Sequence, residues 1–230
     1  TGIENGVSRS GAIGGISGNA AGMFSITDCD NTGAITCTNT SKGGRAGGIL
    51  GLVDISTVNG TVVCCKNTGA VNSYQYAGGI MGMNASPNVT IDRCFNTGAI
   101  FGYSSGSTYI GGIVASSNGN ISNCYNTGNY TISLNSTSGT KAAHAGGIVS
   151  DFGGTVVTNC YDVGKFQYTG TASSSTSYGA ICGSGYGTSS SNKLVNCYAL
   201  NSTVGEDINN GCVTVKTDEE MKAPAYISVL

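Results

Sequence analysis

The chain has 230 residues, of which 38 are Gly, 2 are Pro and none is Trp. Only 10% of the residues are charged and the net charge is −2, so no basic surface is expected for nucleic acid or acidic membranes. Hydrophobic residues make up 39% and recur at fixed positions, which excludes a disordered chain, and no apolar run is long enough for a membrane-spanning helix.

A glycine pair followed by an aliphatic residue recurs from one end of the chain to the other. In chain order the copies are Gly14-Gly15-Ile16, Gly47-Gly48-Ile49, Gly78-Gly79-Ile80, Gly111-Gly112-Ile113, Gly146-Gly147-Ile148 and the degenerate Gly179-Ala180-Ile181. Successive isoleucines are 33, 31, 33, 35 and 33 residues apart. A period of this length indicates a repeat architecture.

A second motif, Cys-x-Asn-Thr-Gly, accompanies each glycine pair. It runs from Cys29 to Gly33, Cys65 to Gly69, Cys94 to Gly98 and Cys124 to Gly128. It then decays at Cys160, where Asp162 replaces the Asn, and at Cys197, where Ala199 does. The last two units are therefore expected to break the Asn column.

The sequence of each repeat unit predicts three short strands. They are Gly-Ile-x-Gly, the alternating run ending at Cys, and the residues after the Gly of Cys-x-Asn-Thr-Gly. Gly interrupts every segment and no 3.6-residue period survives, which leaves no room for ordinary helices. We therefore predict an all-β fold, a right-handed parallel β-helix (β-solenoid) of about six to seven coils with roughly 33 residues per coil, spanning residues 1–216.

Stacked coils place equivalent residues in columns along the axis, at the inter-strand spacing of roughly 4.8 Å. One inward column is expected to contain Ile16, Ile49, Ile80, Ile113, Ile148 and Ile181. A second is expected to contain Cys29, Cys65, Cys94, Cys124, Cys160 and Cys197. A ladder of stacked amides is expected from Asn31, Asn67, Asn96 and Asn126, and the Gly two places later is expected to take a positive φ.

The two ends of the chain carry further signals. Thr1-Gly2-Ile3-Glu4-Asn5-Gly6 aligns with the middle of a repeat, so we expect more repeats or a cap before it. Residues 217–230 are expected to form a capping segment, because Thr217-Asp218-Glu219-Glu220 is typical of a capping box that opens a short helix limited by Pro224. The longest insertions, Asn129 to His144 and Gln167 to Tyr178, separate the third strand from the next glycine pair.

The repeat units resemble GLUG-motif repeats, especially in Ala77-Gly78-Gly79-Ile80-Met81-Gly82 and Cys94-Phe95-Asn96-Thr97-Gly98. This resemblance implies a bacterial cell-surface or secreted, adhesin-like protein. Similar repeats occur in non-catalytic parts of immunoglobulin A-cleaving metallopeptidases.

Ten cysteines raise the questions of disulfides and metal sites. Zinc sites use Cys-x₂₋₄-Cys pairs, which this chain lacks, and the adjacent Cys64 and Cys65 point to opposite faces of a strand. Parallel Cβ vectors stacked in register suit the disulfide dihedral poorly, so the repeat cysteines are expected to be free thiols in the core. Cys182 and Cys212, about one coil apart, are the pair most suited to a disulfide. No metal site and no cofactor are expected.

Catalysis finds little support in the sequence. His144 is the only histidine, which excludes a His-Glu-x-x-His zinc site and leaves only a remote Ser-His-Asp possibility with Asp151. Polysaccharide-degrading β-helices need clustered carboxylates, whereas the twelve acids here are scattered, and Asp92 and Arg93 are expected on opposite faces of a strand. The chain is therefore not expected to be an enzyme.

Two outward columns are the candidate ligand-binding residues. The residue after the repeat Cys is Asp30, Lys66, Phe95, Tyr125, Tyr161 or Tyr198, and the residue four places before the repeat Ile is Arg45, Tyr76, Tyr109 or His144. Aromatic side chains offer contact area to sugars and proteins at low entropic cost. The alternative is that these rings only pack on one another along the solenoid.

We therefore expect a non-catalytic structural or adhesive repeat domain, outside the cell or on the surface of a bacterium. Its expected partners are a host glycan or protein, or neighbouring domains of the same polypeptide, with no nucleic acid and no membrane insertion. The alternatives are an accessory module of a larger secreted enzyme, such as a metallopeptidase, and a polysaccharide-degrading β-helix enzyme.

Overall fold

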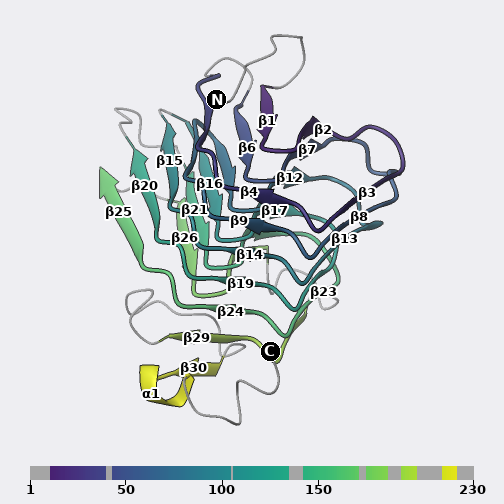
Figure 1. Cartoon of the computed structure of the whole chain (residues 1–230). Helices are drawn as coiled ribbons and strands as arrows, with labels where there is room; N and C mark the ends of the chain where they lie inside the picture. Colours follow the sequence, from purple (N-terminus) through teal and green to yellow (C-terminus); the bar gives the residue numbers. More distant parts are fainter. Residues whose placement is uncertain are drawn as a thin grey trace.

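The chain winds into a parallel β-solenoid whose coils stack along one axis from the N-terminal to the C-terminal end (Figure 1). The computed structural model describes residues 11–39, 43–104, 106–134, 142–170, 175–185, 193–200 and 214–221. Five parallel sheets, here called sheets A to E, run along the axis, and each coil contributes one short strand to each sheet. This confirms the predicted fold class.

The strands of each sheet follow one another at the repeat period. Sheet A contains β1 (Ala12–Gly14), β6 (Arg45–Gly47), β11 (Tyr76–Gly78), β16 (Thr108–Gly111), β21 (Ala142–Gly146) and β26 (Ser175–Gly179). Sheet B contains β2 (Ser17–Asn19), β7 (Leu50–Val53), β12 (Met81–Asn84), β17 (Val114–Ser117), β22 (Val149–Phe152) and β27 (Cys182–Ser184). Sheet C contains β3 (Phe24–Thr27), β8 (Gly60–Val63), β13 (Val89–Asp92), β18 (Ile121–Ser122), β23 (Val156–Thr158) and β28 (Lys193–Val195).

The remaining two sheets complete each coil. Sheet D contains β4 (Asp30–Asn31), β9 (Lys66–Asn67), β14 (Phe95–Asn96), β19 (Tyr125–Asn126), β24 (Tyr161–Asp162), β29 (Tyr198–Leu200) and β30 (Thr214–Lys216). Sheet E contains β5 (Ile35–Cys37), β10 (Val71–Ser73), β15 (Ile100–Ser104), β20 (Tyr130–Leu134) and β25 (Phe166–Gly170). The described strands make about five turns followed by part of a sixth, slightly fewer than the six to seven predicted.

Each complete coil has five strands, not the three that the sequence predicts. The residues before the glycine pair form a strand of their own in sheet A. The predicted strand ending at Cys stops one corner early, and the residues after Cys form the two-residue strand of sheet D. Both differences arise because a bend that lasts one or two residues separates strands that the hydrophobic pattern joins.

The corner between sheets C and D is a single residue with positive φ, directly before the repeat Cys. These residues are Asp28 (54°), Cys64 (53°), Arg93 (51°), Asn123 (53°), Asn159 (53°) and Asn196 (51°). Four of the six are Asn or Asp, which tolerate this left-handed region better than other non-glycine residues. The positive φ predicted for the Gly of Cys-x-Asn-Thr-Gly is wrong, because that Gly is absent from the positive-φ residues of the described chain.

Close stacking of the coils explains why the last residue of Cys-x-Asn-Thr-Gly is Gly. A Cβ atom added to Gly69, Gly98 or Gly128 would overlap the carbonyl oxygen of the equivalent Gly in the preceding coil. The column therefore requires Gly for the distance between coils and not for its own dihedral angles.

The interior holds two apolar clusters. One contains the repeat isoleucines Ile49, Ile80, Ile113, Ile148 and Ile181 together with the repeat cysteines, and the other contains inward residues of sheets A and E such as Val71 and Ile110. Those five isoleucines are fully buried, but Ile16 is 49% exposed. The prediction that Ile16 lies in the core is therefore wrong, because no described coil covers the outer side of the first one.

The C-terminal capping box forms as predicted. The backbone N–H of Thr217 donates to the Glu220 carboxylate over 2.8 Å, and the Glu220 N–H donates to Thr217 Oγ1 over 3.2 Å. Helix α1 (Asp218–Met221) follows, beside β30 at the C-terminal end of the stack (Figure 1). Residues 222–230, with Pro224, lie outside the described residues, so the domain division at residue 217 stays a prediction. Within the described residues, no helix has the length and the apolar sequence that crossing a membrane requires.

Candidate interaction surface

An internal ladder of side-chain amides connects the coils. The Nδ2 atoms of Asn31, Asn67 and Asn96 donate to Oδ1 of the Asn in the next coil over 2.7–2.8 Å. The second proton of each amide goes to the carbonyl oxygen of the repeat Gly two residues later, at 2.8 Å. This arrangement confirms the predicted Asn ladder, which places four hydrogen-bonding groups in the interior without leaving them unpaired.

Asp162 continues this ladder and does not break it. Its Oδ1 accepts Asn126 Nδ2 over 2.8 Å, and its Oδ2 accepts the hydroxyl of Tyr130 over 3.0 Å. The side chain is fully buried, and burial raises the pKa of Asp162 to about 7 although these hydrogen bonds lower it. The ladder ends there, because β24 pairs Asp162 with Ala199 in β29. We call Asn31, Asn67, Asn96, Asn126 and Asp162 the inner ladder.

The repeat cysteines form a thiol column, defined as Cys29, Cys65, Cys94, Cys124, Cys160 and Cys197. All six thiols are free, and all but Cys29 are buried. Each thiol donates to the carbonyl oxygen two residues earlier, for example Cys124 to Ser122 over 3.0 Å. Burial raises the pKa of the Cys124 and Cys160 thiols well above the ordinary range, so both are protonated at neutral pH. Cys212, the predicted partner of Cys182, lies outside the described residues.

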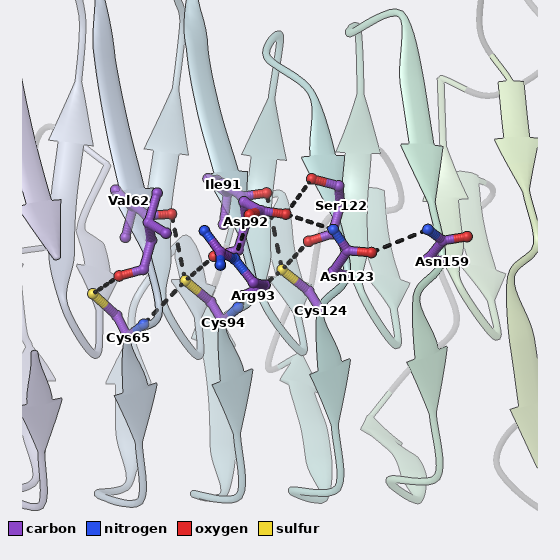
Figure 2. Close-up of polar contacts among 11 residues, drawn as sticks. Val62, Cys65, Ile91, Asp92, Arg93, Cys94, Ser122, Asn123, Cys124 and Asn159 are labelled. Atoms are coloured by element: carbon purple, nitrogen blue, oxygen red, sulfur yellow. Dashed lines mark hydrogen bonds and ion pairs between the residues drawn. The ribbon is translucent and has the colours of Figure 1, made fainter. Parts of the chain in front are cut away.

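A second polar ladder runs along the positive-φ corner, outside the thiol column (Figure 2). Asn196 donates to Asn159 over 3.2 Å, Asn159 to Asn123 over 3.0 Å, and Asn123 to Asp92 Oδ1 over 2.7 Å. Asp92 also accepts Ser122 Oγ over 2.7 Å. We call Asp92, Asn123, Asn159 and Asn196 the corner ladder.

Asp92 and Arg93 form an ion pair, with 2.8 Å between Arg93 Nε and Asp92 Oδ2 (Figure 2). The prediction that the two side chains point to opposite faces is wrong, because the positive φ of Arg93 turns it out of the strand. Partial burial raises the pKa of Asp92, but hydrogen bonds from Ser122, Asn123 and Arg93 outweigh that effect and lower it. The sequence signal for the rest of the corner ladder is the Asn directly before Cys124, Cys160 and Cys197.

Three rings of the predicted aromatic column on sheet D form a continuous stack, namely Phe95, Tyr125 and Tyr161. The strand register aligns Phe95, Tyr125, Tyr161 and Tyr198. The rings of Phe95 and Tyr125 are 4.8 Å apart and within 2° of parallel, and those of Tyr125 and Tyr161 are 4.9 Å apart and within 6°. Below Phe95 the column changes to the ion pair between Lys66 and Asp30, at 2.5 Å.

The second predicted column, on sheet A, also stacks. Tyr76 and Tyr109 are 4.8 Å apart and 6° from parallel, and Tyr109 and His144 are 4.9 Å apart and 14° from parallel. The Arg45 guanidinium lies 5.2 Å from the centre of the Tyr76 ring. Burial lowers the pKa of His144, although the nearby Asp151 raises it.

This stacking limits what the rings offer to a ligand. Each inner ring turns its faces toward the rings one coil above and below, so a sugar or side chain that needs a ring face can reach it fully only at the ends of a column. The inner rings present only their edges and hydroxyl groups to the protein surface. The candidate site is therefore a strip of edges and hydroxyls on sheet D and a half-buried strip on sheet A.

Groups that could perform catalysis or hold a metal are dispersed in the described part of the chain. No three His, Cys, Asp or Glu residues there gather around one point. His144 lies beside Ser177 across the paired strands β21 and β26, but the Ser177 hydroxyl donates to the carbonyl oxygen of Gly183. Asp151 accepts Ser184 Oγ over 3.0 Å. These contacts give no aligned Ser-His-Asp set.

Comparison with known proteins bears on these repeats. Residues 9–36 match the family model Glug, the GLUG motif. The chain contains a GLUG motif. This match and the structural similarity below confirm the predicted resemblance to GLUG-motif repeats. No curated protein sequence matches the chain.

Among solved structures, the chain is similar to a crystal structure described as a "putative immunoglobulin A1 protease from Bacteroides ovatus". The TM-score is 0.67 and the identity 21%, over 90% of this chain and 67% of that chain. Similarity at this level of identity shows that the two share a fold.

Proposed function

We propose that the chain is a non-catalytic structural and adhesive repeat domain, located outside a bacterial cell or on its surface. The inner ladder carries this proposal. It connects five successive coils through buried side-chain hydrogen bonds of 2.7–2.8 Å, in addition to the backbone hydrogen bonds of five sheets. Such a stack resists bending and is suited to holding surface groups at a fixed distance from a neighbouring domain.

Adhesion would use the surface strip on sheet D. Phe95, Tyr125 and Tyr161 hold their edges in line at 4.8–4.9 Å, and the insertions after sheet E vary from coil to coil. Because the ring faces are turned toward one another, the Tyr hydroxyls are the groups that a glycan or protein would contact first. A regular row of hydroxyls can donate to and accept from successive polar groups of an extended host glycan or polypeptide.

The test is binding to glycan and protein arrays by the wild type and by two double variants. Tyr125→Ala with Tyr161→Ala removes rings and hydroxyls, whereas Tyr125→Phe with Tyr161→Phe keeps the stack and removes only the hydroxyls. We expect the wild type to bind at least one class of ligand and both variants to lose it. Unchanged binding by the Phe variant would show that the hydroxyl row is not the contact, and unchanged binding by both would assign the column to scaffolding.

A second candidate is an accessory module of a larger secreted enzyme, such as a metallopeptidase. It is supported by the fold shared with the structure described as an immunoglobulin A1 protease. In that case the isolated chain would bind immunoglobulin A1 without cleaving it. Gel analysis of immunoglobulin A1 after incubation with the chain tests both statements, since cleavage would contradict a non-catalytic domain.

A further inference from the structure

The first described coil, which begins with β1, ends the stack on its N-terminal side (Figure 1). Ile16 is 49% exposed there, whereas Ile49 at the same position of the second coil is fully buried. Ile26 and Cys29 also lie at the margin of the apolar core and are only partly buried. Part of the apolar interior is therefore open at this end.

The backbone beside the glycine pair has an unused acceptor at the same end. In every later coil the carbonyl oxygen of the repeat Ile accepts two N–H groups from the coil before it, over 2.9–3.1 Å. The Ile49 oxygen, for example, accepts the N–H groups of Ile16 and Ser17. Among the residues that the structure describes, none donates to the carbonyl oxygen of Ile16.

The backbone of sheet D has the opposite requirement, because here the later coil donates to the earlier one. The residue after each later repeat Cys donates to the carbonyl oxygen of the Cys one coil earlier, over 2.9–3.2 Å. The residue after each later member of the inner ladder does the same, as Thr68 does to Asn31 over 2.8 Å. The corresponding N–H groups of Asp30 and Thr32 have no acceptor within the described ranges.

The inner ladder begins on an oxygen that is one donor short. Oδ1 of Asn96 accepts two hydrogen bonds, from the Asn67 amide over 2.8 Å and from the Gly98 N–H over 3.2 Å. Oδ1 of Asn31 accepts only the N–H of Gly33, over 3.2 Å, because the Asn31 amide donates to the following coil. Asn31 is only 9% exposed, so solvent has little access to this oxygen.

We propose that this end of the stack is a docking surface for one further coil with the motif Cys-x-Asn-Thr-Gly, joined to the chain on its N-terminal side. The C-terminal side of such a coil presents the N–H groups after the glycine pair, the Cys and Asn carbonyl oxygens and the Asn amide. These are the groups with which each coil of the protein binds the next. Joining is required because an isolated coil has no neighbour to stack on and would have to be ordered entirely on docking.

Other occupants do not match this pattern of donors and acceptors. Two copies docked through their first coils would set the Asn31 oxygens against each other with no proton between them. The C-terminal end of a second copy has Ala199 at the ladder position, so it offers no amide. A short helix such as α1 would cover Ile16 but would bring no row of strand carbonyl oxygens to Asp30 and Thr32.

The test extends the full chain with a copy of residues 76–96 placed directly before Thr1, which completes Cys-Phe-Asn-Thr-Gly in the sequence. Amide hydrogen exchange, measured by NMR, is the readout. We expect exchange at Asp30 and Thr32 to slow by about tenfold or more relative to the chain without the extension. A copy of residues 45–67 serves as a second extension, in case the first does not fold. Unchanged exchange in both extended chains would overturn the proposal.

A matched variant tests the amide itself. Asn96→Asp, made in the copy alone, keeps the shape of the side chain but removes the N–H that Asn31 would accept. We expect the chain extended with Asn to unfold at a higher urea concentration at pH 7 than the chain extended with Asp. Equal midpoints would contradict the choice of an Asn-bearing coil.

Two further measurements separate docking of a joined coil from the other occupants. Ile16→Ala should lower the urea midpoint at least about twice as much in the extended chain, where Ile16 would be covered, and an equal effect in both chains would contradict docking. The copy added as a separate peptide should leave exchange at Asp30 unchanged. Slower exchange with the separate peptide would contradict the need for joining. Exchange that slows as the concentration of the unextended chain rises would indicate a second copy and overturn the proposal.

Discussion

Asp162 Oδ1 accepts a hydrogen bond from Asn126 Nδ2 over 2.8 Å, in the position that an amide oxygen occupies in every earlier coil of the inner ladder. A carboxylate can accept this bond but cannot donate onward. The last link of a buried amide ladder is therefore a group that titrates, while the links before it do not.

Asp162 makes the stability of the solenoid depend on pH. Its pKa is about 7 in the folded chain, against an ordinary value of 3.8, so the folded state holds the proton more tightly than the unfolded state. The stabilisation is complete below the ordinary pKa and is lost as the pH rises toward 7. We expect Asp162→Asn to raise the free energy of unfolding at pH 8 by up to about 4 kcal/mol, three pKa units at 1.36 kcal/mol each, and to raise it little at pH 4. Urea denaturation at both pH values measures the difference.

Asp92→Asn is the matched control, since Asp92 ends the corner ladder and the pKa of Asp92 is lowered. Its stabilisation is present above the ordinary pKa and is lost as the pH falls through the lowered value. This variant should therefore weaken the fold at neutral pH and have less effect in acid. The same sign of pH dependence in both variants would contradict these assignments.

Removal of one inner amide should cost more than removal of an outer one. Asn96→Ala leaves the amide of Asn67 and the N–H of Gly98 without acceptors in a buried site. We expect a loss of about 2–5 kcal/mol in the free energy of unfolding, from two unpaired buried groups. Asn72→Ala removes one surface contact with Thr36, 3.4 Å long, and should cost well under 1 kcal/mol. Equal midpoints in urea would contradict the importance of the ladder.

The distance between coils makes the repeat Gly intolerant of a single methyl group. In Gly98→Ala the new Cβ would overlap the carbonyl oxygen of Gly69, so the two coils would have to separate locally. We expect a loss of several kcal/mol, about 3 or more, typical of overpacking against a backbone that cannot move aside. Gly22→Ala, where no atom lies within 4 Å of the new Cβ, should be nearly neutral. Thermal unfolding of the two variants provides the comparison.

Two isoleucines at the same repeat position should differ in their contribution to stability. Ile113 is fully buried in the middle of its column, whereas Ile16 is 49% exposed at the end. Ile113→Ala should therefore cost about 2–5 kcal/mol through lost burial and a cavity. Ile16→Ala should cost less than half as much, because its surroundings can relax into solvent. Similar unfolding midpoints would show that the first coil is covered in solution.

Most of the fold could be predicted from the sequence, because identical side chains at one period can satisfy one another only by stacking. The columns of Ile113, Cys94 and Asn96 each follow from one repeated letter. The strand count could not be predicted in this way. The corner at Arg93 occupies one residue and leaves the alternation of apolar residues intact, so the pattern does not mark it.

The candidate surface was only half predictable. The repeat period places Tyr125 and Tyr161 in one column, and the structure stacks them there. The period does not say that parallel rings at 4.9 Å turn their faces to one another, which changes the groups offered to a ligand. The corner ladder was missed because Asn123, Asn159 and Asn196 share one backbone conformation with Arg93 and Cys64 but not one residue type. Asp92, which ends the ladder, lies one position earlier, in β13.

The two side-chain ladders point in opposite directions. In the inner ladder one N–H bond of each amide is directed toward the C-terminal coils, from Asn31 to Asp162, whereas in the corner ladder the bonds run from Asn196 back to Asp92. The peptide dipoles of an α-helix add along its axis. Here the two rows of amide dipoles oppose each other. In the coils that carry both ladders, from Asn96 to Asp162, the polarity of one row therefore offsets that of the other along the axis.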